Sequence, residues 1–288
     1  MRLLVSTLHG LRPMASAAAP AAPHSSTAAA AAIMHHSTSF LSSPTPTQLQ
    51  LALLILNVEK QTLGSGGLFS HLWRASQLRV CADGAANRLH DAFLADDEAR
   101  GAHLPDLIAG DLDSLRDDVA QFYAARGVPI ARQPEQDRHD FEKCLTWLRQ
   151  RQGDAAPRLS VVAMGAFGGR LDQQMANINM LYRYAGAFER LVLLGDESLA
   201  FLLPAGKHVI EPNPEVEEGT CGLIPLGGRC TRVRTSGLRW NLSDAPLEFG
   251  SLVSSSNKFV DARVTVETSS PLLWTTSLHR AAVKHARL

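Results

Sequence analysis

The sequence predicts an α/β domain followed by an all-β sandwich domain. From Leu51 to Pro204, short apolar runs alternate with amphipathic stretches of helical length, a pattern typical of strand–helix units around a parallel sheet. After Pro204, short apolar runs and turns follow one another without intervening helices, as in a β-sandwich. The chain has 288 residues, 45% of them hydrophobic, which is enough for a full core in each part. We therefore expect a Rossmann-like parallel-sheet domain over residues 50–204 and a sandwich over residues 205–288.

The first domain contains six candidate strands and two well-marked helices. The strands are expected at Leu51–Asn57, Leu78–Ala82, Leu107–Ala109, Val128–Ala131, Leu159–Met164 and Leu191–Leu194. The stretches Asp140–Arg151 and Leu171–Tyr184 carry apolar residues at helical spacing and are expected to flank the sheet. The sandwich strands are expected at Lys207–Glu211, Cys221–Pro225, Thr231–Thr235, Phe249–Ser254, Arg263–Glu267 and Leu272–Leu278.

Residues 1–49 are rich in Ala, Ser and Pro, and no acidic residue precedes Glu59. Such a composition cannot form a packed core, so we expect a disordered or targeting extension. Net charge is zero and no basic helix face recurs, which argues against a nucleic-acid partner and an anionic membrane surface. The four cysteines lack CxxC spacing, and the apolar run Leu51–Leu56 is too short to span a membrane.

Two carboxylates, Asp111 and Asp113, follow the strand that Gly110 closes. Ligands of parallel sheets gather at the carboxyl ends of the strands. Two neighbouring ionised carboxylates favour a hard divalent cation, usually Mg²⁺ bound with substrate phosphates. The alternative is that Asp113 or Ser114 only caps the next helix, with Asp117 completing an S-x-x-D box.

Three further polar clusters follow predicted strands. Asp83 begins a turn into a helix whose first amides offer an anion site, or it is an ordinary capped turn. Asp140 and Lys143 share a helix face, where they suit a metal and a phosphate or form a solvated ion pair. Arg170 ends a glycine-rich loop and can offer a forked donor to phosphate oxygens. Four such clusters exceed what independent capping should produce.

The second domain adds Trp240, which lies in a polar run. It suits stacking on a flat cationic ring, or it packs within the sandwich. Ser254, Ser256 and Asn257 either bind the edge of a heteroaromatic ring or close a hairpin.

Taken together, these segments resemble the thiamine pyrophosphokinase family between Leu51 and Leu278. The similar blocks, in order, are DGAANRL at Asp83, GDLDS at Gly110, QDRHDFEKCL at Gln136, GGRLDQ at Gly168, CGLIPLG at Cys221, SGLRWNL at Ser236, SSSN at Ser254 and VTVET with LLWT near the end. The resemblance implies an α/β domain, a sandwich domain and a homodimer. It also implies transfer of diphosphate from ATP to thiamine, with release of AMP, in the cytosol. A plastid or mitochondrial location directed by residues 1–50 is the alternative.

The resemblance implies a role for each matching residue. Asp111, Asp113 and Asp140 would bind Mg²⁺, and Asp83 would line the same acidic pocket as a fourth catalytic aspartate. Residues implied in ATP or phosphate binding are Gln136, Lys143 and Arg170, and residues implied around thiamine are Asp172, Gln173, Trp240, Ser256 and Asn257. Trp240 would reach across the dimer, which places the active sites at the subunit interface.

The chain departs from the family pattern at three positions. Ala85 stands where Gly is usual, Leu112 where Phe is usual, and His139 where Thr is usual. His139 is larger and titratable, so we expect reduced activity. Two other interpretations remain open: a metal-dependent glycosyltransferase that uses the DxD motif, and a non-catalytic protein that binds thiamine or a nucleotide.

Overall fold

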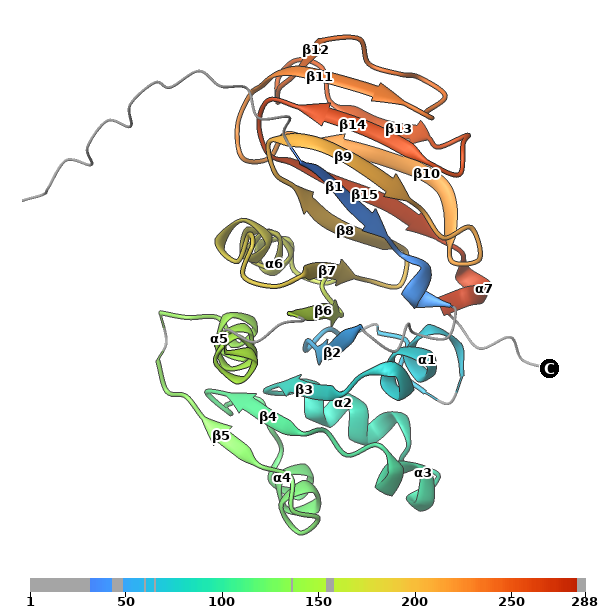
Figure 1. The fold of residues 1–288 in the computed structure, drawn as a ribbon. Coiled ribbons are helices and arrows are strands. Elements are labelled where there is room, and N and C mark those ends of the chain that lie inside the picture. The colour runs from blue at the N-terminus through green and yellow to red at the C-terminus, as the bar shows by residue number, and fades with distance from the viewer. Residues whose placement is uncertain are drawn as a thin grey trace, which may run out of the picture. The chain divides into compact units, whose positions relative to one another are not determined.

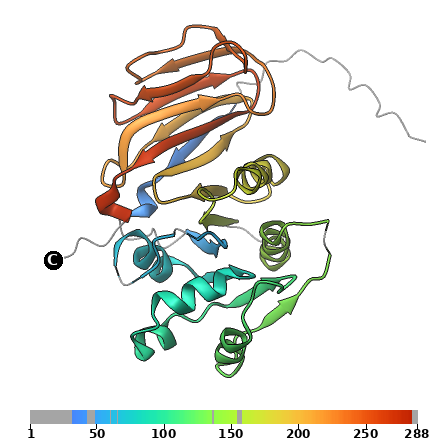
Figure 2. The same ribbon diagram turned by 180° about the vertical axis from the view of Figure 1, so that it is seen from behind.

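The computed structural model describes residues 32–42, 49–59, 61–64, 66–135, 137–153 and 158–283. Within this part of the chain, the strands form one ten-stranded sheet and one five-stranded sheet. Figure 1 shows the helices gathered around one half of the larger sheet, and Figure 2 shows the same arrangement from behind.

Six neighbouring strands of the larger sheet run parallel, in the order β7-β6-β2-β3-β4-β5. They are β2 (Gln50–Ile55), β3 (Leu78–Ala82), β4 (Leu107–Gly110), β5 (Ile130–Arg132), β6 (Leu159–Met164) and β7 (Arg190–Leu194). β6 is buried along its whole length. Central parallel strands are covered on both faces, so continuous apolar runs are expected there. The six predicted strands of the first domain are confirmed, with boundaries that shift by up to two residues.

Helices cover both faces of the parallel half. They are α1 (Gly67–Ala75), α2 (Ala85–Ala92), α3 (Asp97–Ala102), α4 (Asp117–Ala124), α5 (Asp140–Gln152) and α6 (Leu171–Arg183). Alternate residues of β2 enter two different cores: Leu53 packs with side chains of α1, α2 and α4, and Leu54 packs with side chains of α5 and α6. This alternation follows from the two-residue period of a strand. The carboxyl edge of the parallel sheet therefore lies between two helical layers.

The larger sheet continues without interruption into an antiparallel half, because β8 (Ser198–Leu203) pairs with β7 on one side and with β15 on the other. The strands beyond β8 are β15 (Leu272–Leu278), β10 (Glu217–Ile224) and β13 (Ser254–Lys258). The second sheet has the order β1-β9-β14-β11-β12, comprising β1 (Ile33–Ser37), β9 (Gly206–Glu211), β14 (Val264–Thr268), β11 (Cys230–Ser236) and β12 (Ala245–Leu247). A short helix, α7 (Arg280–Val283), ends the described chain. One apolar core is shared by the two sheets, as in a sandwich.

Two features of the antiparallel part differ from the prediction. The predicted strand Phe249–Ser254 is wrong, because this segment forms a turn in which Glu248 N donates to Leu252 O at 2.9 Å. Its large apolar side chains face solvent, with Phe249 59% exposed. The residues SSSNK instead form β13, which pairs with β10, so the hairpin-closing alternative for them is also wrong. β8 and β12 were not predicted.

Residues 33–41 lie within the segment predicted as an extension, yet they fold. β1 pairs in parallel with β9, and the short 3₁₀ helix η1 (Ser39–Leu41) buries Phe40 and Leu41 almost completely. Thr38 Oγ1 donates to the buried carboxylate of Glu217. The folded chain therefore begins before residue 50, earlier than predicted, because two large side chains and a sheet edge hold this segment. The predicted extension over residues 1–31 lies outside the described residues.

Candidate active site

Three aspartates meet at the carboxyl edge of the parallel sheet. Asp83 follows β3, Asp111 follows β4, and Asp140 is the first residue of α5. One carboxylate oxygen from each lies within 4.8 Å of the other two, close enough to share a metal ion. Asp83 is buried, whereas Asp111 and Asp140 are each partly exposed. In open parallel sheets, ligands usually bind at the carboxyl ends of the strands.

The local backbone brings these carboxylates together. Gly110 ends β4, and a Cβ at this position would lie 2.7 Å from the Asp83 Cβ and 3.0 Å from Asp140 Oδ1. Only glycine permits this approach. Asp83 and Leu112 both adopt a positive φ, 45° and 65°, which is unfavourable for residues with a Cβ. Such strain is concentrated at functional sites, where the surrounding structure enforces it.

A buried cation balances part of the negative charge. Lys143 Nζ lies 3.0 Å from Asp140 Oδ1 and 3.8 Å from Asp111 Oδ2, and its side chain is 1% exposed. The lysine of this pair is buried and Asp140 is partly exposed, so the pair is not the solvated surface pair of the alternative prediction. Asp83 Oδ1 is buried and has no hydrogen-bond partner among the described residues. Burial raises the pKa of the Asp83 carboxyl, and the nearby Asp140 and Asp111 carboxylates raise it further.

Asp113 lies beside this group and is exposed. Ser114 Oγ donates to Asp113 Oδ1 at 3.0 Å, and Asp113 N donates to Asp111 Oδ1 at 3.2 Å. The next helix, α4, starts at Asp117 after Arg116, with no side-chain capping bond. The capping interpretation of this segment is therefore wrong, because neither DxD carboxylate caps α4.

The glycine-rich loop after β6 reaches the same sheet edge. Gly168 and Gly169 have φ values of 107° and 68°, which favour glycine. Arg170 precedes α6 and pairs with Asp172 at the surface, where both side chains are largely exposed. Gln173 is exposed one residue further. Within the described residues, no hydrogen bond or ion pair joins Arg170 to the three aspartates. Gln136 lies outside the described residues.

Three of the five predicted thiamine residues, Trp240, Ser256 and Asn257, lie in the antiparallel part, whereas Asp172 and Gln173 lie in α6. Trp240 is 57% exposed, so the alternative of a packed sandwich tryptophan is wrong. Its main chain is held by the buried Asn257, whose Nδ2 donates to Trp240 O at 2.8 Å and whose Oδ1 accepts from Trp240 N at 3.3 Å. Ser256 has a φ of 56° and lines a depression of about 170 Å³ together with Ser255 and Thr220. The exposed indole and this depression give the sandwich a candidate ligand surface.

The two clusters are far apart within one chain. β13, which carries Ser256 and Asn257, stands first in the strand order of the larger sheet, and β3, which precedes Asp83, stands eighth. At about 4.8 Å per strand, the separation along the sheet is roughly 34 Å. One chain therefore does not bring Trp240 next to Asp111.

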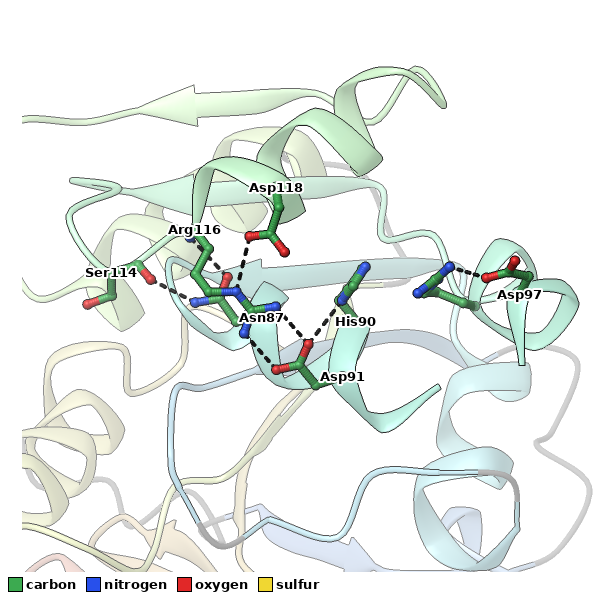
Figure 3. Close-up of polar contacts among 8 residues, drawn as sticks. Asn87, His90, Asp91, Asp97, Ser114, Arg116 and Asp118 are labelled. Atoms are coloured by element: carbon green, nitrogen blue, oxygen red, sulfur yellow. Dashed lines mark hydrogen bonds and ion pairs between the residues drawn. The ribbon is translucent and has the colours of Figure 1, made fainter. Parts of the chain in front are cut away.

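Sequence reasoning missed two amides near the acidic group. Asn57 follows β2 and packs against Gly84. A Cβ at position 84 would lie only 2.5 Å from Asn57 Nδ2. Asn87, in α2, binds the main chain of Ser114 and Arg116 (Figure 3). A polar residue directly after a buried strand was the available signal for Asn57.

A cavity and the lengths of the helices lie outside the question of the acidic site. A cavity of about 340 Å³ lies at the opposite end of β7, between β1 and residues such as Phe188 and Arg190, and contains none of the predicted site residues. Within the described residues, each helix is too short or too polar to cross a bilayer.

Comparison with known proteins gives the family. The profile "Thiamin pyrophosphokinase, catalytic domain" matches residues 69–193, and "Thiamin pyrophosphokinase, vitamin B1 binding domain" matches residues 207–273. Thiamine pyrophosphokinase 1 of Arabidopsis thaliana is 39% identical over 261 residues, which are 87% of this chain and 95% of that protein. The chain belongs to the thiamine pyrophosphokinase family.

Other members of the thiamine pyrophosphokinase family support this placement. Thiamine pyrophosphokinase 1 of Oryza sativa subsp. japonica is 37% identical over 264 residues, covering 85% of this chain and 97% of that protein. The crystal structure of yeast thiamin pyrophosphokinase superposes with a TM-score of 0.77 at 28% identity, covering 88% of this chain and 94% of that one. The predicted order of an α/β part followed by a sandwich is confirmed.

Proposed function

We propose that this protein transfers the diphosphate group of ATP to the hydroxyethyl group of thiamine, giving thiamine diphosphate and AMP. The group of Asp83, Asp111 and Asp140 at the carboxyl edge of the parallel sheet carries this proposal, together with membership of the family. A non-catalytic thiamine-binding protein would not need three converging carboxylates. A glycosyltransferase would not need the exposed Trp240 in a sandwich.

The acidic group suits Mg²⁺, because hard oxygen ligands from one or two carboxylates and substrate phosphates are what this ion prefers. Among the described residues, the buried Oδ1 of Asp83 has no hydrogen-bond partner, which suits a cation close to this carboxylate. We assign Asp111, Asp113 and Asp140 as the Mg²⁺-binding residues and Asp83 as the buried wall of the site. When bound, Mg²⁺ would neutralise charge on the phosphates of ATP and polarise the phosphorus that is attacked.

The protein residues position the reactants rather than forming a covalent intermediate. Lys143 is fixed between Asp140 and Asp111 and holds positive charge close to the phosphates. Arg170 stands at the start of α6 on an exposed loop, where its forked donors can leave Asp172 for phosphate oxygens. Gln136 is assigned to the nucleotide, and Asp172 and Gln173 are assigned to the substrate shell.

Thiamine is assigned to the sandwich. The exposed indole of Trp240 offers a face to the cationic thiazolium ring. Ser256 lies beside it on β13, and its hydroxyl suits the polar edge of the pyrimidine ring. Asn257 is assigned to this surface through its buried amide, whose two polar atoms already bind main-chain groups. Asn257 also fixes the main chain of Trp240, so the stacking surface is pre-organised.

We propose a homodimer, and the separation between the two clusters supports it. Roughly 34 Å of sheet lies between β13 and β3, which thiamine is too small to span. Two copies of the chain, each offering Trp240 to the acidic group of its partner, would complete two active sites at the interface. We place this enzyme in the cytosol, in keeping with the expectation from the family.

The test is incubation of the purified protein with ATP, Mg²⁺ and thiamine, with chromatographic detection of thiamine diphosphate and AMP in equal amounts. Asp111→Asn should lower the rate by at least about a hundredfold, because a charged ligand at the phosphates is lost. Asp106→Asn, at the opposite end of β4, is the matched control and should retain most activity. Folded protein that binds thiamine yet yields no AMP would overturn the proposal in favour of a sensor.

A further inference from the structure

The side chain of Asn87, in α2, fastens the loop that carries Asp111 and Asp113 (Figure 3). Asn87 Nδ2 donates to Ser114 O at 2.7 Å, and Asn87 Oδ1 accepts from Arg116 N at 3.1 Å. Both polar atoms of the amide thus bind main-chain groups two residues apart. Because no other side chain can offer a donor and an acceptor in this geometry at the same length, the contact is specific to asparagine.

A second contact holds the main chain of the same residue. Ser114 N donates to Asp83 Oδ2 at 3.3 Å, so the N–H and the C=O of Ser114 both bind the segment between Asp83 and Asn87. Leu112, within the loop, has a φ of 65°. A positive φ is unfavourable for a residue with a Cβ. Contacts with residues outside the loop are therefore needed to keep Leu112 in this conformation.

The far end of the loop is fixed as well. The Arg116 guanidinium donates to both carboxylate oxygens of Asp91 at 2.7 Å, as Figure 3 shows, and to Asp118 Oδ1 at 3.2 Å. His90 Nδ1 lies 3.0 Å from Asp91 Oδ1. The forked pair resists sliding of α4 along α2, but both of its side chains are 43% exposed, which weakens it. The amide of Asn87 is less exposed than this pair and holds the loop at Ser114, closer to Asp111 and Asp113.

We propose that Asn87 is a positioning residue for the metal-binding carboxylates, because it holds the loop in the conformation that turns Asp111 toward Asp140 and Asp83. The inference rests on the proposed function, which assigns Mg²⁺ to this group. Asn87 contacts neither substrate nor metal in this assignment and acts only through the main chain of Ser114 and Arg116. Its loss should weaken metal affinity, with a smaller effect on the rate at saturating metal.

The experiment measures Mn²⁺ binding without turnover, from the electron paramagnetic resonance signal of the free ion. Asn87→Ala should raise the apparent Kd for Mn²⁺ about tenfold, the effect typical of losing a residue that orients metal ligands. Amide hydrogen exchange of residues 107–116 should become faster in the same variant. Gln77→Ala is the matched control, because this amide also binds a main-chain N–H, that of Leu51, at the opposite sheet edge.

Asn87→Asp separates positioning from charge. It keeps an acceptor for Arg116 N but places a carboxylate oxygen against the carbonyl of Ser114, which disrupts the loop. Its added negative charge alone would tighten Mn²⁺ binding, whereas lost positioning weakens it. Weaker binding in this variant therefore supports the proposal, and tighter or unchanged binding overturns it.

The outcomes also separate this inference from the proposed function. If the wild-type protein binds no Mn²⁺, the proposed metal site is wrong, and so is the role of Asn87 that depends on it. Wild-type protein that binds Mn²⁺, with Asn87→Ala binding equally well and exchanging its loop amides at the same rate, would overturn only the role of Asn87. Because Asn87 lies at the helix surface rather than in the core, both variants are expected to fold.

Discussion

The ammonium of Lys143 lies 3.0 Å from Asp140 Oδ1 and is enclosed by protein, although it belongs to an acidic site that faces solvent. This lysine is one helical turn after Asp140, so α5 supplies a carboxylate and its counter-charge together. The arrangement keeps three neighbouring carboxylates compatible with folding before any cation binds.

Replacing Lys143 with Met should destabilise the protein by about 3 kcal/mol, toward the low end for breaking a buried pair, because Asp140 and Asp111 are partly exposed. Added Mg²⁺ should restore part of this loss, since the ion replaces the missing charge. Urea unfolding with and without Mg²⁺ measures both effects. Lys207→Met, which removes a surface pair with Glu267, is the control and should change stability by less than about 1 kcal/mol. Equal stability of the Lys143 variant and wild type would contradict the prediction.

Replacing Trp240 with Ala should raise the KM for thiamine about tenfold, corresponding to ~1.4 kcal/mol of lost stacking, and leave the KM for ATP unchanged. Stability should hardly change, because the indole is 57% exposed. Initial rates at varied thiamine and varied ATP provide the measurement. Phe249→Ala removes another exposed aromatic ring from the same part of the chain and serves as the control. An equal rise in both KM values would show that Trp240 does not act through thiamine.

The pair of Asp91 and Arg116 predicts a pH dependence of stability. Hydrogen bonds from Arg116 lower the pKa of Asp91 from 3.8 to about 2. A carboxyl group with a lowered folded-state pKa stabilises the fold above its unfolded pKa, and this contribution is lost as pH falls through the folded value. The stability difference between wild type and Asp91→Asn should therefore be constant above about pH 5, fall as the pH drops through the folded pKa, and vanish near about pH 1. It should be small, below about 1 kcal/mol, because the pair is exposed.

Urea unfolding of both proteins across this pH range gives the difference directly. Arg263→Ala, which removes a surface pair with Glu211 in the sandwich, provides a comparison for general acid effects. A difference that grows on acidification has the wrong sign and would exclude the proposed origin.

A chain that begins at residue 43 should be less stable than one that begins at residue 32. It lacks β1 and η1, and the burial of Phe40 and Leu41 alone contributes about 3 to 6 kcal/mol. It also leaves Glu217 without the hydroxyl donor of Thr38 in a buried position. Thermal unfolding of the two chains checks this expectation. Identical midpoints would mean that β1 contributes nothing to the sandwich.

Much of the parallel half was predictable because its signals are local. β3, β6 and the start of α5 follow from apolar runs and helical spacing within a few residues. Strand-end geometry placed Asp111 where a ligand would bind, and the family resemblance implied that Asp83 lines the same pocket. Phe249–Ser254 was misjudged because an apolar run there bends back on itself and exposes its side chains.

The sequence by itself determined the family blocks, the order of the α/β part and the sandwich, and the candidate carboxylates. Only the tertiary structure decided that Lys143 is buried among them, that Asn87 anchors their loop, that β1 belongs to the sandwich, and that Trp240 lies far from Asp111. These relationships depend on contacts between residues distant in sequence. A sequence pattern reports the periodicity of one segment and carries no information on which other segment packs against it.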